Sequence, residues 1–452
     1  MAITITQHAD TPNLANNRLL YAVTSISSSK PQYRFVLDIN DDSGTLLQRL
    51  KQQPNPNDTG IFDIGQIITN YTGPTDQVWE ISAVTANTAC AKQFQVRVGE
   101  EYATTVTSSA TLYTGDSPAA AGSPNVSSSN YHYFIDGAWD PTKDGFDWAY
   151  ATKYDEEDTD GATTFSHQNG LTAFDTHSIK LNQHATISFL NGNTRGTASA
   201  DVDSSKAQDV YGMVVKQYDA NGVIGTSSTI YNLAGPRSAN TELWDDVYTS
   251  QNETTRLVHF PVGTQNLVDA GITLDSDLSY YIVSFHNQTL DPAVNDNGVY
   301  GEYRFNVEDP ECAFDGTRFA WKNIYGVWDY FNFNLADTQT SQIARESYTQ
   351  NFVDYSATNT VSYDAQRRGA TQFQNSITQM RTAESDYLTQ TEADNVRELF
   401  YSANVFAYID SKWQPIVIET ANVTEKTNNR SQKLFRYTVE YKLANQPQAN
   451  RS

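Results

Sequence analysis

Residues 312–333 read CAFDGTRFAWKNIYGVWDYFNF, and this stretch decides which fold we expect. Its pattern predicts a strand over 317–321, a turn that contains Asn323 and Gly326, and a second strand over 328–333. Gly326 suits the turn because glycine adopts a positive φ without strain. The density of aromatic side chains predicts that the hairpin is deeply packed.

Eight aromatic residues of this hairpin and of the C-terminal strand are candidate packing or assembly residues. They are Phe319, Trp321, Trp328, Tyr330, Phe333, Phe435, Tyr437 and Tyr441. Side chains alternate between apolar and polar along 435–443, so one face of that strand must be buried, either in its own sheet or against a neighbouring subunit.

Strand-like alternation recurs through the rest of the chain, while segments with helical periodicity are scarce. Examples are 19–24, 33–39, 94–98 and 256–262. A mainly β fold is therefore expected.

Two local signals stand out against this background. Asn221 and Gly222 lie between two strand-like runs and predict a hairpin with a tight primed turn. Thr389 and Glu392 have the spacing of a capping box, and apolar residues at helical spacing follow them. The sequence thus predicts one short helix near residues 390–403.

We expect two or three β-sandwich-like domains. Low-complexity Ser, Ala, Gly and Pro cannot support a core, so a run of them indicates a linker. The predicted order is a β-sandwich domain at 1–106, a Ser/Ala/Pro-rich linker or loop at 107–130, a central β domain at 131–310 and a C-terminal β domain at 311–452 with the aromatic hairpin and the helix.

Composition excludes several classes of partner. The chain has 30 basic and 53 acidic residues, hence a formal net charge of −23. Such a surface repels phosphate backbones and anionic membranes, so direct nucleic-acid binding is not expected. The first residues lack the basic and apolar regions of a signal peptide, and no run of 18 apolar residues occurs, so no membrane association is expected.

Sequence motifs for chemistry are absent. There is no phosphate-binding glycine loop, no dinucleotide fingerprint, no HExxH and no GxSxG. The seven histidines are scattered, and Cys90 and Cys312 either form one long-range bridge or remain two buried thiols. The acidic run 155–161 is either a solvated loop or an incidental cation site, since its spacing departs from that of an EF-hand. We expect no enzyme activity, no cofactor and no metal.

One cluster supports an alternative. Trp139, Asp140, Asp144, Asp147 and Trp148 combine aromatic faces with carboxylates, a combination that can bind a sugar. The other interpretation is a turn-rich loop with packed aromatic side chains.

The aromatic segment 312–333 resembles a recurring segment of virion structural proteins of tailed bacteriophages, including crAss-like and marine podovirus types. The segments 33–38 and 62–71 look like the opening module of those proteins, and the sequence after Thr389 looks like their close. The resemblance covers about the first hundred and the last 140 residues.

This resemblance implies a structural component of the virion, such as a neck or tail ring, a tail-associated protein or an auxiliary head protein. Its partners would be copies of itself and other virion proteins, and no catalytic residues are implied. The alternative function is a receptor- or glycan-binding module of a phage tail or surface appendage that recognises a host surface glycan.

Overall fold

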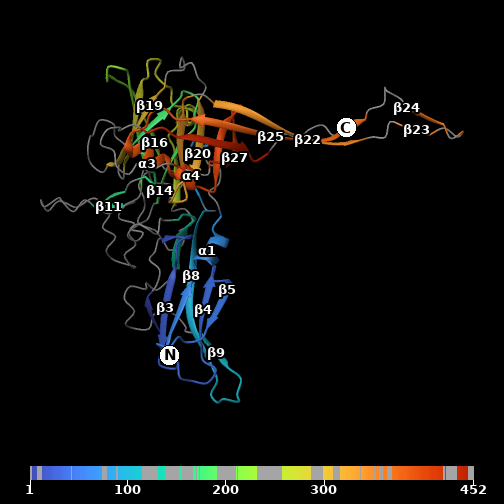
Figure 1. Cartoon of the computed structure of the whole chain (residues 1–452). Coiled ribbons are helices and arrows are strands. Elements are labelled where there is room, and N and C mark those ends of the chain that lie inside the picture. Colours follow the sequence, from blue (N-terminus) through green and yellow to red (C-terminus); the bar gives the residue numbers. More distant parts are fainter. Residues whose placement is uncertain are drawn as a thin grey trace. The chain divides into compact units, whose positions relative to one another are not determined.

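The structure is a computed structural model that describes part of the chain. The described residues are 3–7, 13–41, 43–73, 79–87, 90–114, 131–138, 152–154, 166–168, 170–172, 174–190, 210, 212–231, 257–286, 299–308, 316–335, 337–349, 353–355, 358, 360–363, 369–420, 423 and 435–445. Within these ranges the chain is mainly β, with several sheets and a short helical segment near the C-terminus (Figure 1).

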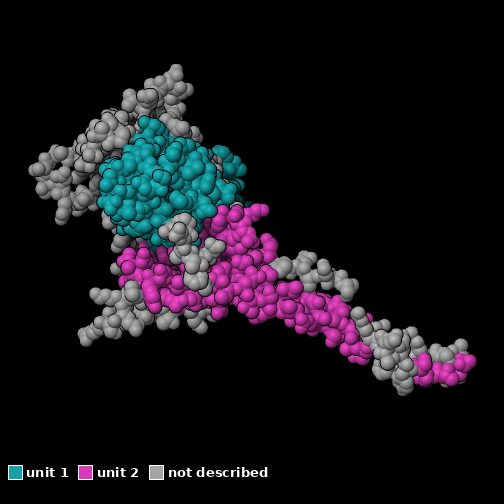
Figure 2. Space-filling view, turned by 90° about the horizontal axis from the view of Figure 1, so that it is seen from above, with its two compact units in different colours: residues 1–310, 322–329 teal, residues 311–321, 330–452 magenta. Residues whose placement is uncertain are grey.

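The chain divides into two compact units (Figure 2). Unit 1 comprises Met1–Pro310 and Lys322–Asp329, and unit 2 comprises Glu311–Trp321 and Tyr330–Ser452. The division runs through the aromatic hairpin, whose strands are β20 (Thr317–Lys322) and β21 (Trp328–Phe333). The turn of this hairpin therefore belongs to unit 1.

Unit 1 begins with two sheets that enclose one apolar core. The strands of the first sheet are, in spatial order, β1 (Ile3–Gln7), β3 (Leu20–Ser25) and β6 (Thr59–Asp63). Those of the second sheet are β2 (Asn13–Leu14), β10 (Tyr131–Ile135), β8 (Ala91–Tyr102), β4 (Arg34–Asn40) and β5 (Leu46–Gln52). A further strand, β9 (Thr111–Thr114), also pairs with β8. Tyr21 and Val23 of β3 share a buried cluster with Phe35 and Leu37 of β4. Alternate residues of both sheets thus face each other, as in a sandwich.

The first sheet system extends past residue 106. Strand β9 lies within 107–130 and pairs with β8, and β10, at the start of the predicted central domain, pairs with β8 as well. Residues 115–130 lie outside the described ranges. Alternation in the sequence indicates that a segment is a strand but not which sheet the strand joins. The pairing of β9 and β10 with β8 therefore could not be predicted from the sequence.

Two further sheets of unit 1 form a second core. The strands of the five-stranded sheet are, in spatial order, β13 (Thr176–Ile179), β19 (Val299–Val307), β18 (Tyr280–His286), β15 (Gly212–Tyr218) and β16 (Ile224–Tyr231). Those of the three-stranded sheet are β14 (Thr186–Leu190), β17 (Leu257–Pro261) and β7 (Thr85–Ala86). Phe189 of β14 and Phe260 of β17 both contact Phe285 of β18, with ring centroids 4.5 and 5.1 Å away. The aromatic rings therefore fill the space between the sheets.

Small elements complete unit 1. They are α1 (Gly65–Tyr71), α2 (Thr264–Asp269) and the pair β11 (Thr152–Tyr154) and β12 (Ser166–Gln168). The two helices were not predicted, because one or two turns are too short to display a helical period.

The hairpin at residues 212–231 is present, but its turn differs from the predicted one. Gly222 has a φ of +77°, whereas Asn221 keeps a negative φ, so the turn is not the primed two-residue type. The Asp219 carboxylate accepts hydrogen bonds from the backbone N–H groups of Asn221 and Val223. These bonds stabilise a longer loop in which only the glycine needs the left-handed conformation.

Unit 2 is built on one seven-stranded sheet. Its order is β21, β20, β26 (Val405–Ile409), β27 (Lys412–Ile418), β28 (Thr438–Leu443), β25 (Ala370–Glu384), β22 (Asp337–Thr349). Between β22 and β25 lies a smaller pair, β23 (Val353–Tyr355) and β24 (Val361–Tyr363). The primed two-residue turn that was expected elsewhere occurs here, because Asp410 and Ser411 both have positive φ and join β26 to β27.

The predicted helix is confirmed as two consecutive short helices, α3 (Gln390–Val396) and α4 (Glu398–Tyr401). Thr389 and Glu392 form the capping box, since each side chain bonds the backbone N–H of the other residue. Ala393, Val396 and Leu399 are buried. Local sequence was sufficient here because a cap needs only neighbouring residues.

Candidate interaction surfaces

The turn of the aromatic hairpin is held by one asparagine. The Asn323 side chain donates hydrogen bonds to the carbonyl of Leu171 at 2.8 Å and to Asp329 at 2.9 Å, and its oxygen accepts from the backbone N–H of Tyr325. Gly326 has a φ of +78°, and a Cβ there would lie 2.1 Å from the carbonyl oxygen of Asp136. The predicted roles of Asn323 and Gly326 as turn residues are confirmed.

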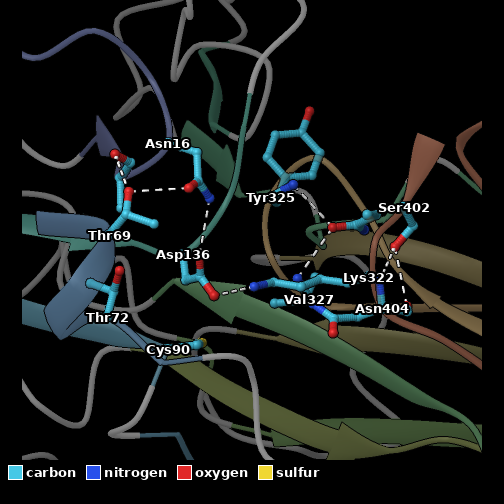
Figure 3. A network of polar contacts seen from close by, with 12 residues as sticks. Asn16, Thr69, Thr72, Cys90, Asp136, Lys322, Tyr325, Val327, Ser402 and Asn404 are labelled. Carbon is cyan, nitrogen blue, oxygen red and sulfur yellow. Dashed lines mark hydrogen bonds and ion pairs between the residues drawn. The ribbon is translucent and has the colours of Figure 1, made fainter. Parts of the chain in front are cut away.

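A buried ion pair lies beside this turn within unit 1 (Figure 3). The Lys322 ammonium contacts Asp136, whose other carboxylate oxygen accepts a hydrogen bond from Asn16 at 3.0 Å. The two charged side chains are only 10% and 11% exposed. Asn16 is fixed in turn by the hydroxyl of Thr69. Each group has a partner, so the network suits packing rather than ligand binding.

All eight predicted packing residues are buried in the chain itself. Tyr441 of β28 contacts Phe319 of β20 with ring centroids 5.3 Å apart, and Tyr437 contacts Phe400 of α4 at 5.6 Å. The apolar face of the C-terminal strand is thus covered within unit 2. The hypothesis that a neighbouring copy covers these aromatic surfaces does not agree with this burial, so an assembly surface has to lie elsewhere.

A serine and a histidine meet in the second core of unit 1. Ser188 Oγ lies 2.6 Å from His259 Nδ1, and both side chains are buried. Nε2 of His259 is buried without a hydrogen-bond partner among the described residues. Burial lowers the pKa of His259 to about 3. An imidazole so hard to protonate and closed to solvent is a poor general base, so we interpret the pair as structural.

This histidine predicts acid sensitivity. The unfolded chain binds the proton below pH 6.5, whereas the folded chain resists it down to about pH 3. The contribution is therefore neutral above pH 6.5, and stability falls as the pH is lowered through this window by about 1.4 kcal/mol per pH unit. The free energy of unfolding should be measured with urea between pH 6.5 and 4.5. In His259→Gln its slope against pH should be smaller than in the parent by up to about 1.4 kcal/mol per pH unit, the value for one proton. Parallel slopes for the two proteins would contradict the prediction.

A long exposed hairpin, formed by β22 and β25, projects from the sheet of unit 2 (Figure 1). Thr338–Thr349 is exposed throughout. Strand β28 pairs with β25 only from Met380 onward, so Ala370–Gln379 has β22 as its one partner among the described residues. We define residues 341–379 as the arm. The arm was not predicted from the sequence, although its long proline-free runs rich in Thr, Ser and Gln were a visible signal.

The base of the arm is firmly anchored in unit 2. Arg381 lies 3.3 Å from the Asp337 carboxylate, which also accepts a hydrogen bond from the hydroxyl of Thr317 at 3.1 Å. Tyr441 packs nearby, and its burial together with the charge of Asp337 raises its pKa to about 12. The arm thus begins at the seven-stranded sheet and continues as a two-stranded ribbon.

Several candidate residues lie outside the described ranges. These are the predicted sugar-binding residues Trp139, Asp140, Asp144, Asp147 and Trp148, the acidic run 155–161 and Cys312. Cys90 is described and is buried in an apolar cluster with Val327 and Leu257. The sugar site, the cation site and the pairing of Cys312 stay predictions.

The described ranges contain no group of three or more His, Cys, Asp or Glu side chains placed to hold a metal ion. Nor do they contain a helix with the length and hydropathy needed to cross a membrane. No protein-family model matches the chain, and no curated protein matches its sequence.

Proposed function

We propose that the chain is a structural subunit of a bacteriophage particle, acting as a neck or tail ring, a tail-associated protein or an auxiliary head protein. It works by packing against copies of itself and other virion proteins and performs no catalysis. The resemblance of the aromatic hairpin and of both ends of the chain to virion structural proteins motivates the proposal.

The observation that carries an assembly role is the arm. Its strands expose both faces, and a two-stranded ribbon of this kind is marginally stable alone in water. A long exposed strand edge offers main-chain donors and acceptors to another chain. By contrast, the eight packing aromatics are buried inside the two compact units. A compact body that carries an extended arm is suited to building a lattice or ring.

Mass spectrometry of purified particles tests this function. The chain should be present at a constant copy number per particle after removal of loosely bound protein by density-gradient centrifugation. A known capsid protein of the same particles provides the reference for stoichiometry, and a host protein of similar abundance in the lysate provides the negative control. Absence of the chain from the particles would overturn the proposal.

A further inference from the structure

We propose that the arm is an adhesive strand pair whose partner is a second copy of this chain, which it joins by edge-to-edge β pairing. This inference rests on the proposed structural function and names its partner. The first observation is topological. Strand β22 is the last strand of the seven-stranded sheet, so its outer edge has no strand beside it among the described residues.

The second edge of the arm is open as well. Met380 is the first residue of β25 that pairs with β28. In the segment Ala370–Gln379 before it, the strand pairing among the described residues is with β22 on one side. Among the described residues, the ribbon therefore has no strand paired to either of its two edges. Unpaired backbone groups at such edges gain hydrogen bonds when another strand is added.

The arm has few of the devices that normally keep strand edges apart. Monomeric β proteins protect their edges with charged side chains, lysine above all, and with proline. Residues 341–379 contain no lysine and no proline, and the charged residues of β22 within the arm are the adjacent Arg345 and Glu346, whose charges are opposite. The edge strand β5 of unit 1 differs, because Arg49 and Lys51 give it a net positive charge. A long edge with no lysine, no proline and no net charge is expected where pairing is required.

Apolar side chains are exposed on the same ribbon. Ile343 and Tyr348 of β22 are 47% and 49% exposed, and Phe373 of β25 is 47% exposed. Tyr348 and Phe373 contact each other across the strands with ring centroids 6.0 Å apart. Ile343 lies directly opposite Ile377. The side chains of an added strand would pack beside these on the same face, so the pairing would bury part of them in addition to forming main-chain hydrogen bonds.

Charge favours a second copy as the partner. Residues 341–379 hold three arginines and three acidic residues, so the arm is formally neutral and the remainder of the chain carries the whole charge of −23. The acidic parts of two copies repel each other. If the two copies touch through their neutral arms, the acidic parts stay at a distance. The arm is thus the part of the chain that can meet another copy at the lowest electrostatic cost.

Deletion of the arm is the first test. Residues 341–379 are replaced by Asn-Gly, which closes a two-residue hairpin between the paired residues Thr340 and Met380. The deletion leaves the net charge at −23 and keeps the seven strands of the sheet. Sedimentation equilibrium should show concentration-dependent association of the full chain and a monomer for the deletion variant at every concentration tested. A full chain that stays monomeric, or a deletion variant that associates equally, overturns the inference.

A matched pair of point variants separates edge pairing from general stickiness. Ile343→Glu places a charge on the exposed arm and should weaken association at least tenfold. Val268→Glu is the control, because Val268 in α2 is 46% exposed and lies outside the arm. It should associate as the parent does. Equal weakening by both variants would overturn the inference.

Hydrogen exchange tests the main-chain bonds themselves. On association, amides of 341–349 or 370–379 should exchange at least tenfold more slowly, while those of β5 should not change. Association without this protection would overturn edge pairing. The proposed function does not fall with it, since that function is contradicted only when the chain is missing from purified particles.

Discussion

Trp328→Ala is expected to abolish the soluble fold of unit 1. Trp328 is 3% exposed and packs edge-on against Trp79 with ring centroids 5.2 Å apart. Its neighbour Val327 lies in a buried cluster with Leu14 and Ile135, so the hairpin turn is part of the core of unit 1. Removing a buried indole costs about 3–5 kcal/mol, which approaches the whole stability of a marginal domain.

The measurement is urea unfolding together with the yield of soluble protein. Trp328→Phe keeps an aromatic ring and should show an intermediate midpoint, which gives a readout if the alanine variant cannot be purified. Tyr387→Ala is the control, since Tyr387 is 65% exposed, and its effect should stay within about 0.5 kcal/mol. If Trp328→Ala unfolds at the same urea concentration as Tyr387→Ala, the packing role of this hairpin is wrong.

Lys322→Met is expected to destabilise unit 1 almost as strongly. The substitution leaves the carboxylate of Asp136 buried, with the side-chain amide of Asn16 as its remaining side-chain partner among the described residues (Figure 3). Breaking one side of a buried ion pair costs about 3–5 kcal/mol because an uncompensated charge remains in the interior. The double variant Lys322→Met/Asp136→Asn removes both charges and retains a side-chain oxygen for Asn16, so it should recover most of that loss.

A double-mutant cycle with Asp136→Asn measures the coupling between the two residues. The exposed pair of Lys442 and Glu419 provides the comparison, because both side chains are about one third exposed. Lys442→Met should cost no more than about 1 kcal/mol. Additive effects of the two substitutions at the buried pair would show that their charges do not interact as described.

Local features followed from the sequence because they depend on near neighbours. Period-two alternation located strands β4, β8 and β17, and the aromatic hairpin formed with Gly326 in its left-handed turn position. The capping box of Thr389 and Glu392 begins the helical segment as predicted. At the turn after Tyr218 the prediction was wrong in type, because the side chain of Asp219 selected a longer loop that short-range propensity alone did not reveal.

Only the tertiary structure decided which sheet each strand joined and which apolar face was covered. The alternating C-terminal strand was equally suited to its own sheet or to a neighbouring subunit, and contacts such as that of Tyr441 with Phe319 bury it within unit 2. Conversely, the polar sequences of β22 and β25 did not reveal that their outer halves lack a third strand among the described residues. Periodicity records two faces of a strand, whereas the partner on either edge is set by residues far away in sequence.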